Sequence, residues 1–177
     1  GPPDRRARRG HLAGHQDDIN LGSNIAGRNR LETEELIGFF INLLVIRARL
    51  SGDPTFSELL ARVRESALGA YAHQDVPFEK LVEELQPPRD PSRPPLVQVV
   101  FDFVSQQTSM PQLPGLELST LPLGEHLGKF DLVLNVEVGE HGLGAALQYN
   151  ADLFDNSTVA RLLNHFEIVL REAAANP

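Results

Sequence analysis

The sequence predicts an α+β fold in which a mixed β-sheet is backed by helices. Segments rich in branched and aromatic residues alternate along the chain with segments whose apolar residues recur at helical spacing. Two late strand candidates flank Gly139-Glu140-His141-Gly142, a pattern typical of an antiparallel hairpin. With 177 residues, 41% of them hydrophobic, the chain is long enough to bury one core without disulfides.

The first thirteen residues differ in composition from the rest. Residues 1–13 carry four arginines among proline, glycine and alanine, without apolar periodicity, and we expect a flexible arm. A solvated tail and a phosphate-binding arm are both compatible with this pattern. The opening Gly1-Pro2 resembles the remnant of a cleaved tag, which suggests a piece of a longer protein. We expect residues 14–177 to form the folded part.

The first strands and a short helix are expected before residue 54. Residues 19–23 form a short strand candidate, and residues 31–38 favour a short acidic helix. Residues 39–47 are apolar on both faces, which is typical of a central strand covered on two sides. Gly52-Asp53-Pro54 then ends this strand.

Two helices follow, each with its own start signal. Thr55 and Glu58 form a capping box, which predicts a helix over residues 56–72. Pro77 favours a second helix start, with Phe78, Leu81, Val82 and Leu85 on one face. Pro87-Pro88 is expected to end that helix.

The remaining elements complete the sheet. Residues 96–103 predict a strand, and residues 105–127, with three prolines, predict a long excursion. Residues 132–138 and 145–149 are the two arms of the hairpin. Asp155 or Asn156 caps a final helix whose apolar stripe begins at Val159.

Composition excludes several classes of function. A net charge of −8 argues against nucleic acid as a partner, and the chain contains no cysteine. No apolar run approaches the roughly 18 residues that a membrane span needs, so a cytoplasmic protein is expected. The six histidines are scattered rather than paired, and no Gly-x-Ser-x-Gly elbow is present. We therefore predict no metal site and no complete active site.

The first informative motif places an amide in an apolar strand. In Ile37-Gly38-Phe39-Phe40-Ile41-Asn42-Leu43-Leu44-Val45-Ile46-Arg47, the polar Asn42 needs a hydrogen-bond partner, because an unpaired amide is costly to bury. That partner is either a neighbouring backbone group or a substrate in a channel.

The second motif lies between the two expected helices. It is His73-Gln74-Asp75-Val76-Pro77-Phe78-Glu79, in which Asp75 is placed to accept backbone N–H bonds at the second helix start. A capped corner and a catalytic His–Asp pair are the two interpretations.

The third motif combines two guanidinium groups with a carboxylate and rigid prolines. It is Arg89-Asp90-Pro91-Ser92-Arg93-Pro94-Pro95-Leu96, immediately before a strand. Internal Arg–Asp bridging would fix this loop, and docking of a phosphate-bearing ligand is the alternative.

In this order, the three motifs resemble the last three core motifs of the condensation domains of nonribosomal peptide synthetases. The family patterns are Ile/Val-Gly-x-Phe-Val-Asn-Thr ending in Arg, His/Asn-Gln-Asp-Tyr/Val-Pro-Phe-Glu, and Arg-Asp-x-Ser-Arg-x-Pro-Leu. The resemblance runs from about Gly14 to the end of the chain. Further matching runs are Gly14-His15-Gln16-Asp17-Asp18-Ile19, Ala26-Gly27-Arg28, Lys129-Phe130-Asp131-Leu132 and Tyr149-Asn150-Ala151-Asp152-Leu153-Phe154.

The resemblance implies one lobe of a two-lobed, chloramphenicol acetyltransferase-like domain. The implied reaction joins a donor acyl thioester to an acceptor aminoacyl amine, in secondary metabolite biosynthesis such as that of antibiotics. Both substrates are carried on phosphopantetheine arms of carrier proteins, with no directly bound cofactor. The implied partners are the N-terminal lobe, the donor and acceptor carrier proteins and an adjacent adenylation domain.

By the same resemblance, Asn42 is a substrate-channel residue and the other motif residues are structural. The structural set is Gly38, Phe40, Arg47, His73, Gln74, Asp75, Pro77, Phe78, Arg89, Asp90, Ser92 and Arg93. Leu43 and Pro94 depart from the family, which often has Thr and Asn there. Epimerisation and heterocyclisation domains are close relatives, but the run from Gly38 to Asn42 resembles the condensation version more.

The family's His-His-x-x-x-Asp-Gly motif is not found in this sequence, which has no adjacent histidine pair. We therefore expect no catalytic residue in the chain and no activity of the chain alone. The alternative function is a non-catalytic lobe that docks carrier proteins or a partner lobe. We also expect uncovered strand faces at residues 43–46 and 97–101, and hence self-association.

Overall fold

The computed structural model describes residues 16–28, 31–88, 90–91, 93–104, 115–116, 128–139 and 142–176. The elements, in chain order, are β1 (Asp18–Ile25), α2 (Leu31–Glu34), β2 (Asn42–Arg49), α3 (Phe56–Ala72), α4 (Phe78–Leu85), β3 (Val99–Val104), β4 (Leu132–Gly139), β5 (Gly142–Tyr149) and α5 (Asn156–Ala175). None of these helices is both long and apolar enough to span a membrane.

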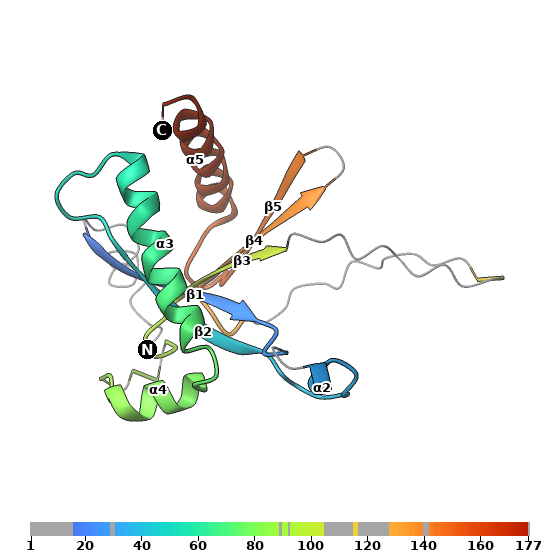
Figure 1. Ribbon diagram of the computed structural model, residues 1–177. Coiled ribbons are helices and arrows are strands. Elements are labelled where there is room, and N and C mark those ends of the chain that lie inside the picture. Colours follow the sequence, from blue (N-terminus) through green and yellow to red (C-terminus); the bar gives the residue numbers. More distant parts are fainter. Residues whose placement is uncertain are drawn as a thin grey trace.

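The strands form one mixed sheet with the order β2-β1-β3-β4-β5 (Figure 1). β3 runs parallel to both of its neighbours, whereas β2 and β5 run antiparallel to theirs. β1 and β3 share only two register pairs, Leu21 with Val99 and Gly22 with Val100. The predicted α+β class with a mixed sheet backed by helices is confirmed.

Helices cover both faces of the sheet. On one face, Leu132 packs with Leu153, Phe154 and Val159, so α5 covers this side. The strand register places Val100 and Val133 on the opposite face, where the core cluster includes Phe78 and Val82 of α4. The core is therefore divided between two layers, because each face of the sheet is apolar near its centre.

The predictions of the three longer helices are confirmed, since their signals are local, whereas α2 occupies only Leu31–Glu34 of the expected residues 31–38. α3 has the predicted bounds, and its capping box is present in both directions between Thr55 and Glu58. α4 begins directly after Pro77 and ends at Gln86, which adopts a left-handed conformation. Asp155 occupies the N-cap position of α5.

Two strand predictions are corrected in part. The strand predicted over residues 39–47 begins only at Asn42, and β2 is an edge strand instead of a central one. Its apolar faces are nevertheless both used, since Leu44 is buried and Leu43 packs on the α4 cluster. The strand predicted from residue 96 begins at Val99, because Leu96 has a φ of 62° and interrupts the extended backbone.

The expectation of bare strand faces at residues 43–46 and 97–101 is wrong, because none of these side chains is exposed. Val97 and Val100 have 0% exposure beneath α4, and Leu44 has 5%. Exposed apolar side chains lie elsewhere, including Phe103 near the end of β3, Ile37, Phe39 and Leu143. The predicted hairpin is confirmed, since β4 and β5 pair in antiparallel orientation. Three segments lie outside the described residues: the hairpin turn at 140–141, the arm at 1–13 and nearly all of the excursion at 105–127.

Candidate functional site

Asn42, at the start of β2, connects the first motif to the second. Its Nδ2 donates to the backbone oxygens of Gln74 and Val76, both at 2.8 Å. Its Oδ1 accepts from the backbone N–H of Leu43 at 3.0 Å and from that of Phe78 at 3.1 Å. The amide therefore uses both donors and both acceptor sites within the protein, as the backbone-partner interpretation requires.

This arrangement also explains how α4 begins. Pro77 holds the N-cap position and supplies no side-chain cap, so Asn42 accepts the Phe78 N–H from a distant strand instead. At the end of α3, the Nδ1 atom of His73 lies 3.0 Å from the Gly69 oxygen. The second motif is thus a corner whose backbone is held by Asn42.

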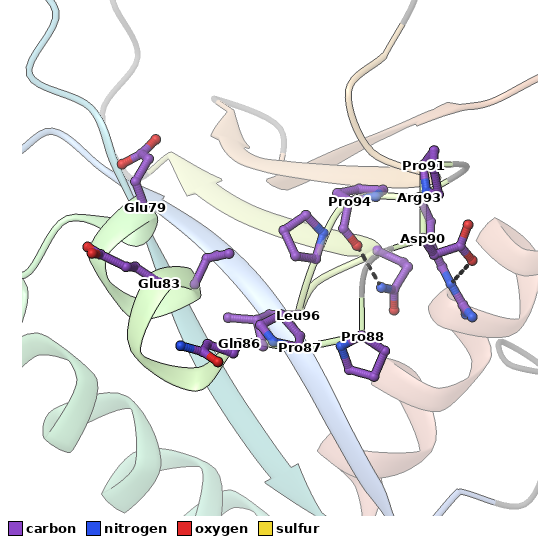
Figure 2. A pocket seen from close by; sticks show the side chains of 13 residues that line it. Glu79, Glu83, Gln86, Pro87, Pro88, Asp90, Pro91, Arg93, Pro94 and Leu96 are labelled. Atoms are coloured by element: carbon purple, nitrogen blue, oxygen red, sulfur yellow. Dashed lines mark hydrogen bonds and ion pairs between the residues drawn. The ribbon is translucent and has the colours of Figure 1, made fainter.

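The third motif forms one wall of a pocket of about 1090 Å³ between α4 and the proline-rich loop (Figure 2). Within the loop, the Nε atom of Arg93 donates to Asp90 Oδ2 at 2.8 Å. Gln98 Nε2 donates to the Pro94 oxygen at 3.1 Å. The Asp90–Arg93 pair agrees with internal bridging of the loop, while Arg89 and Ser92 lie outside the described residues.

A second pocket, of about 640 Å³, joins residues of the first and second motifs. Its wall combines phenylalanine rings with polar and charged side chains. The lining residues include Asn24, Gly27, Phe40, Asn42, Gln74, Phe78, Glu79, Lys129 and Phe130. Glu79 borders both pockets. The three motifs therefore lie on one side of the sheet, around α4.

Arg28 holds the loop that follows β1. The sequence alone did not indicate this structural role. The Arg28 guanidinium donates to the oxygens of Thr33, Glu34 and Leu36, and lies 4.2 Å from the centre of the Phe40 ring. A β-carbon on Gly38 would meet the same ring at 3.0 Å. Arg28 thereby fixes the backbone that leads into Asn42.

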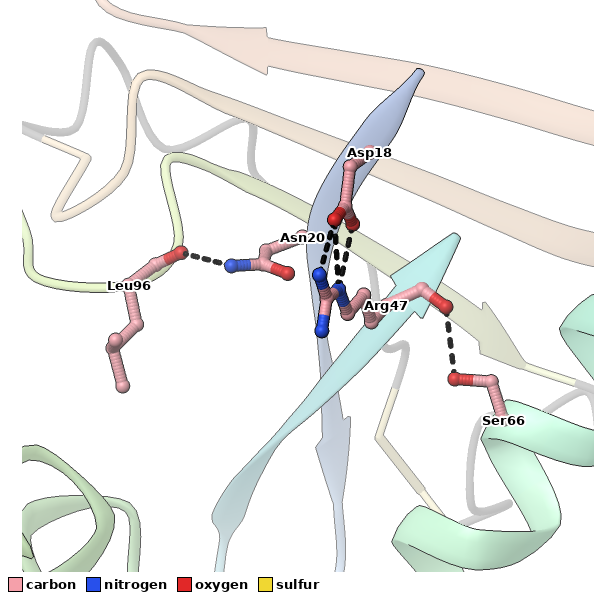
Figure 3. A network of polar contacts seen from close by, with 5 residues as sticks. All are labelled: Asp18, Asn20, Arg47, Ser66 and Leu96. Carbon is pink, nitrogen blue, oxygen red and sulfur yellow. Dashed lines mark hydrogen bonds and ion pairs between the residues drawn. The ribbon is translucent and has the colours of Figure 1, made fainter. Parts of the chain in front are cut away.

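Arg47 lies away from both pockets, on the outer strand (Figure 3). Its Nε donates to Asp18 Oδ1 at 2.7 Å and to Oδ2 at 2.9 Å, and its backbone oxygen accepts from Ser66 Oγ at 2.9 Å. The hydrogen bonds from Arg47 lower the pKa of Asp18 and raise the pKa of Arg47. Arg47 thus ties β2 to β1 and to α3.

The Asp18–Arg47 pair predicts a pH-dependent stability. A carboxyl with a lowered pKa in the folded state stabilises the fold above its ordinary pKa of about 3.9 and loses that contribution as the pH falls. We expect Asp18→Asn to be less stable than wild type at neutral pH, with the difference vanishing in acid. Urea denaturation of both proteins from neutral pH down through that range measures this.

The comparison must isolate Asp18, since the pKa of Glu58 is also lowered, by its hydrogen bond with the Thr55 backbone. Glu58 titrates in both proteins, so only the difference between their curves reports on Asp18. A constant difference at every pH would show that the ion pair does not contribute.

A carboxylate on β3 is a further element that sequence reasoning missed. Asp102 Oδ1 accepts from the backbone N–H of Asn24 at 2.9 Å, and its Oδ2 accepts from Asn24 Nδ2 at 2.8 Å. This contact lies beyond the two backbone register pairs of β1 and β3. Since 78 residues separate the partners, no local signal could have shown it.

The described residues contain no group of three or more histidine, aspartate or glutamate side chains that could hold a metal ion.

A model of the condensation domain family matches residues 12–177. The chain belongs to the condensation domain family.

The curated relatives of this condensation-domain chain are peptide synthetases. It is 51% identical over 165 residues to one of the linear gramicidin synthase proteins of Brevibacillus parabrevis, covering 92% of this chain and 3% of the relative. It is 42% identical over 162 residues to surfactin synthase subunit 1 of Bacillus subtilis (strain 168), covering 92% of this chain and 4% of the relative. The chain therefore spans a very small share of these proteins.

Solved structures confirm the expected lobe of a chloramphenicol acetyltransferase-like fold. The X-domain from teicoplanin biosynthesis aligns with a TM-score of 0.84 and 33% identity, over 98% of this chain and 40% of that one. The condensation domain from Monacolin K polyketide synthase MokA aligns with a TM-score of 0.79 and 22% identity, over 95% of this chain and 39% of that one. The chain thus corresponds to about two-fifths of each solved structure.

Proposed function

We propose that the chain forms part of a nonribosomal peptide synthetase condensation domain that joins a donor acyl thioester to an acceptor aminoacyl amine. The observation that supports this most is the convergence of the motifs, since Asn42 binds the backbone of the second motif and α4 forms a pocket with the third. A family match over residues 12–177 accompanies this geometry.

In this proposal the chain contributes positioning. A thioester is already activated, so the main requirement is to hold two carrier-bound groups in contact and to stabilise charge at the tetrahedral stage. Asn42 fixes the corner beside the smaller pocket, while the Asp90–Arg93 pair fixes the loop of the larger pocket. In the same proposal, phosphopantetheine arms deliver the substrates. The reaction takes place in the cytoplasm.

The partners in this proposal are the remainder of the domain, two carrier proteins and an adenylation domain. A solved four-domain nonribosomal peptide synthetase aligns over 90% of this chain and 13% of that one, with a TM-score of 0.81. At 23% identity this likeness concerns the fold alone. By resemblance, the motif histidine of the other lobe acts in amide formation.

A chimera tests the proposal. Residues 12–177 replace the matching segment of a condensation domain in the linear gramicidin synthase protein to which the chain is 51% identical. We expect carrier-bound peptide product, detected by mass spectrometry, because the segment supplies the matching part of the same kind of domain. The control chimera has the second histidine of the His-His motif replaced by alanine and should make none.

The isolated 177-residue chain is expected to make no amide from loaded carrier proteins above the rate of uncatalysed aminolysis. The sequence contains no adjacent histidine pair, so the group that resemblance links to the reaction is not supplied. The measurement is the rate of product formation with and without the chain. Turnover by the chain alone would contradict this expectation.

A non-catalytic docking lobe is the second candidate. One observation favours it: a complex of the X-domain with OxyB from teicoplanin biosynthesis aligns with a TM-score of 0.72 and 32% identity, over 90% of this chain and 40% of that one. A folded chimera that binds carrier proteins but forms no product would favour docking over catalysis.

A further inference from the structure

The strands of the sheet are not all joined to the same extent. β1 pairs with β2 along its whole length, and β3 pairs with β4 along its whole length. Between these two pairs, β1 and β3 share only the register pairs Leu21 with Val99 and Gly22 with Val100, and the strands then diverge (Figure 1). A sheet can open at such a boundary while its other ladders stay intact. The boundary between β1 and β3 therefore has the least backbone pairing in this sheet.

Close packing holds the two strands together where they do pair. A β-carbon on Gly22 would meet Val97 Cγ1 at 2.8 Å and Val100 Cγ2 at 3.1 Å, so the glycine allows the strands to approach closely. Val97 and Val100 have 0% exposure and pack in the core cluster of α4. The described residues of β1 and β3 form no register pair beyond Gly22 and Val100. These two residues are therefore a fixed point, and the carboxyl ends of both strands lie beyond it.

Beyond the fixed point, a side-chain contact spans the gap between the strands. Asp102 Oδ1 accepts from the backbone N–H of Asn24 at 2.9 Å, and Asp102 Oδ2 accepts from Asn24 Nδ2 at 2.8 Å. Hydrogen bonds to a carboxylate are roughly twice as strong as those between neutral groups. Both bonds are exposed to solvent, so breaking them disrupts little packing. The Asn24–Asp102 pair is thus placed to set the separation of β1 from β3.

The segment that this pair holds forms part of the wall of the smaller pocket. Asn24 lines that pocket, as does Asn42. Across the β1–β2 ladder, Asn24 pairs with Leu43, and Ile25 pairs with Asn42. Asn42 in turn accepts the Phe78 N–H at the start of α4. A movement of the carboxyl end of β1 is therefore passed on to Asn42 and to the corner that begins α4.

We propose that Asp102 is a positioning residue, which holds the carboxyl ends of β1 and β3 together through Asn24 and thereby fixes the β1–β2 wall of the smaller pocket. The Asn24–Asp102 pair is called the clasp below. When the clasp opens, β1 and β2 move together, because their own ladder is complete, and the fixed point at Gly22 and Val100 is the hinge. The wall then moves relative to Phe130, which lines the pocket from the segment before β4.

Hydrogen exchange of the full chain, followed by NMR, tests the clasp. The N–H groups of Leu43 and Phe78 report on the wall, since both donate to Asn42 and neither donates to Asp102. We expect both reporters to exchange at least about fivefold faster in Asp102→Ala than in wild type, because the wall opens more often without the carboxylate. Reporters that exchange at the wild-type rate would overturn the proposal.

Two further N–H groups are controls for a general loss of stability. The Leu50 N–H donates to the Asp17 oxygen at 2.7 Å, at the opposite end of the β1–β2 pair. The Asn150 N–H donates to the Asp131 oxygen at 3.0 Å, outside that pair. We expect the exchange rates of both controls in Asp102→Ala to stay within about twofold of wild type. Equal acceleration of reporters and controls would overturn the proposal, since the contact would then only stabilise the whole fold.

Exchanging the two side chains of the clasp gives a matched pair of variants. Asn24→Asp alone places two carboxylates side by side and should accelerate the reporters. Asn24→Asp combined with Asp102→Asn again faces a carboxylate with an amide, so reporter exchange should return to within about twofold of the wild-type rate. A double variant that exchanges as fast as Asn24→Asp alone would overturn the clasp, even if Asp102→Ala does not fold.

The chimera described above tests the positioning role in the reaction, and this part rests on the proposed function. We expect Asp102→Ala to lower the rate of product formation at saturating carrier protein at least about tenfold, because small displacements in a site are costly. The double variant should restore that rate. An unchanged rate in Asp102→Ala would overturn the positioning role. A chimera without these substitutions that forms no product would instead contradict the proposed function, and the exchange rates would still decide on the clasp.

Discussion

Replacing Asn42 with alanine is expected to lower the free energy of unfolding by about 2–4 kcal/mol. The change removes the donor for the Gln74 and Val76 oxygens and the acceptor for the N–H groups of Leu43 and Phe78. These groups belong to the start of β2, the α3–α4 corner and the first turn of α4. Urea denaturation followed by circular dichroism measures the loss.

Two variants make this prediction specific. Asn20→Ala is the matched control, since Asn20 is exposed and its amide donates one long bond among the described residues, 3.4 Å to the Leu96 oxygen. It should cost less than about 1 kcal/mol. Asn42→Asp keeps the acceptor for Phe78 but places a carboxylate against two carbonyl oxygens, so it should also destabilise. An Asn42→Ala protein as stable as wild type would instead leave the amide free for a role with substrate.

Replacing Gly27 with alanine is expected to be more damaging still, by about 3–5 kcal/mol. Gly27 has a φ of 59°, and a β-carbon there would lie 2.0 Å from the Phe40 oxygen. Because this neighbour is backbone, the strand start that carries Asn42 has to move. The wall of the smaller pocket, which includes Gly27 and Phe40, is then lost together with stability.

Gly52→Ala separates the two causes. Gly52 also has a positive φ, 86°, but nothing lies within 4 Å of an added β-carbon. It should cost only the conformational term, about 1–2 kcal/mol. Equal losses for the two variants, measured by thermal and urea unfolding, would show that the contact with Phe40 is not what requires glycine at position 27.

The sequence determined the helices of this protein, because their signals are local. The side chains of Thr55 and Glu58, three residues apart, each accept a hydrogen bond from the other residue's backbone N–H. This capping needs no distant contact, so the sequence predicts α3 with its bounds. Pro77 presets the first turn of α4 for the same reason. The hairpin arms and the family motifs were also readable from the sequence, since alternation and residue order do not depend on distant contacts.

Only the tertiary structure decided the order of the strands and the role of Asn42. Apolar faces identify a covered strand, yet they do not distinguish an edge strand beneath helices from a central one, as β2 shows. Asn42 needed a partner by sequence, but the partners lie 32 to 36 residues away at the corner that begins α4. The Asn24–Asp102 contact spans 78 residues. Such contacts form only when packing brings distant segments together, because nothing in the local sequence specifies which segments will meet.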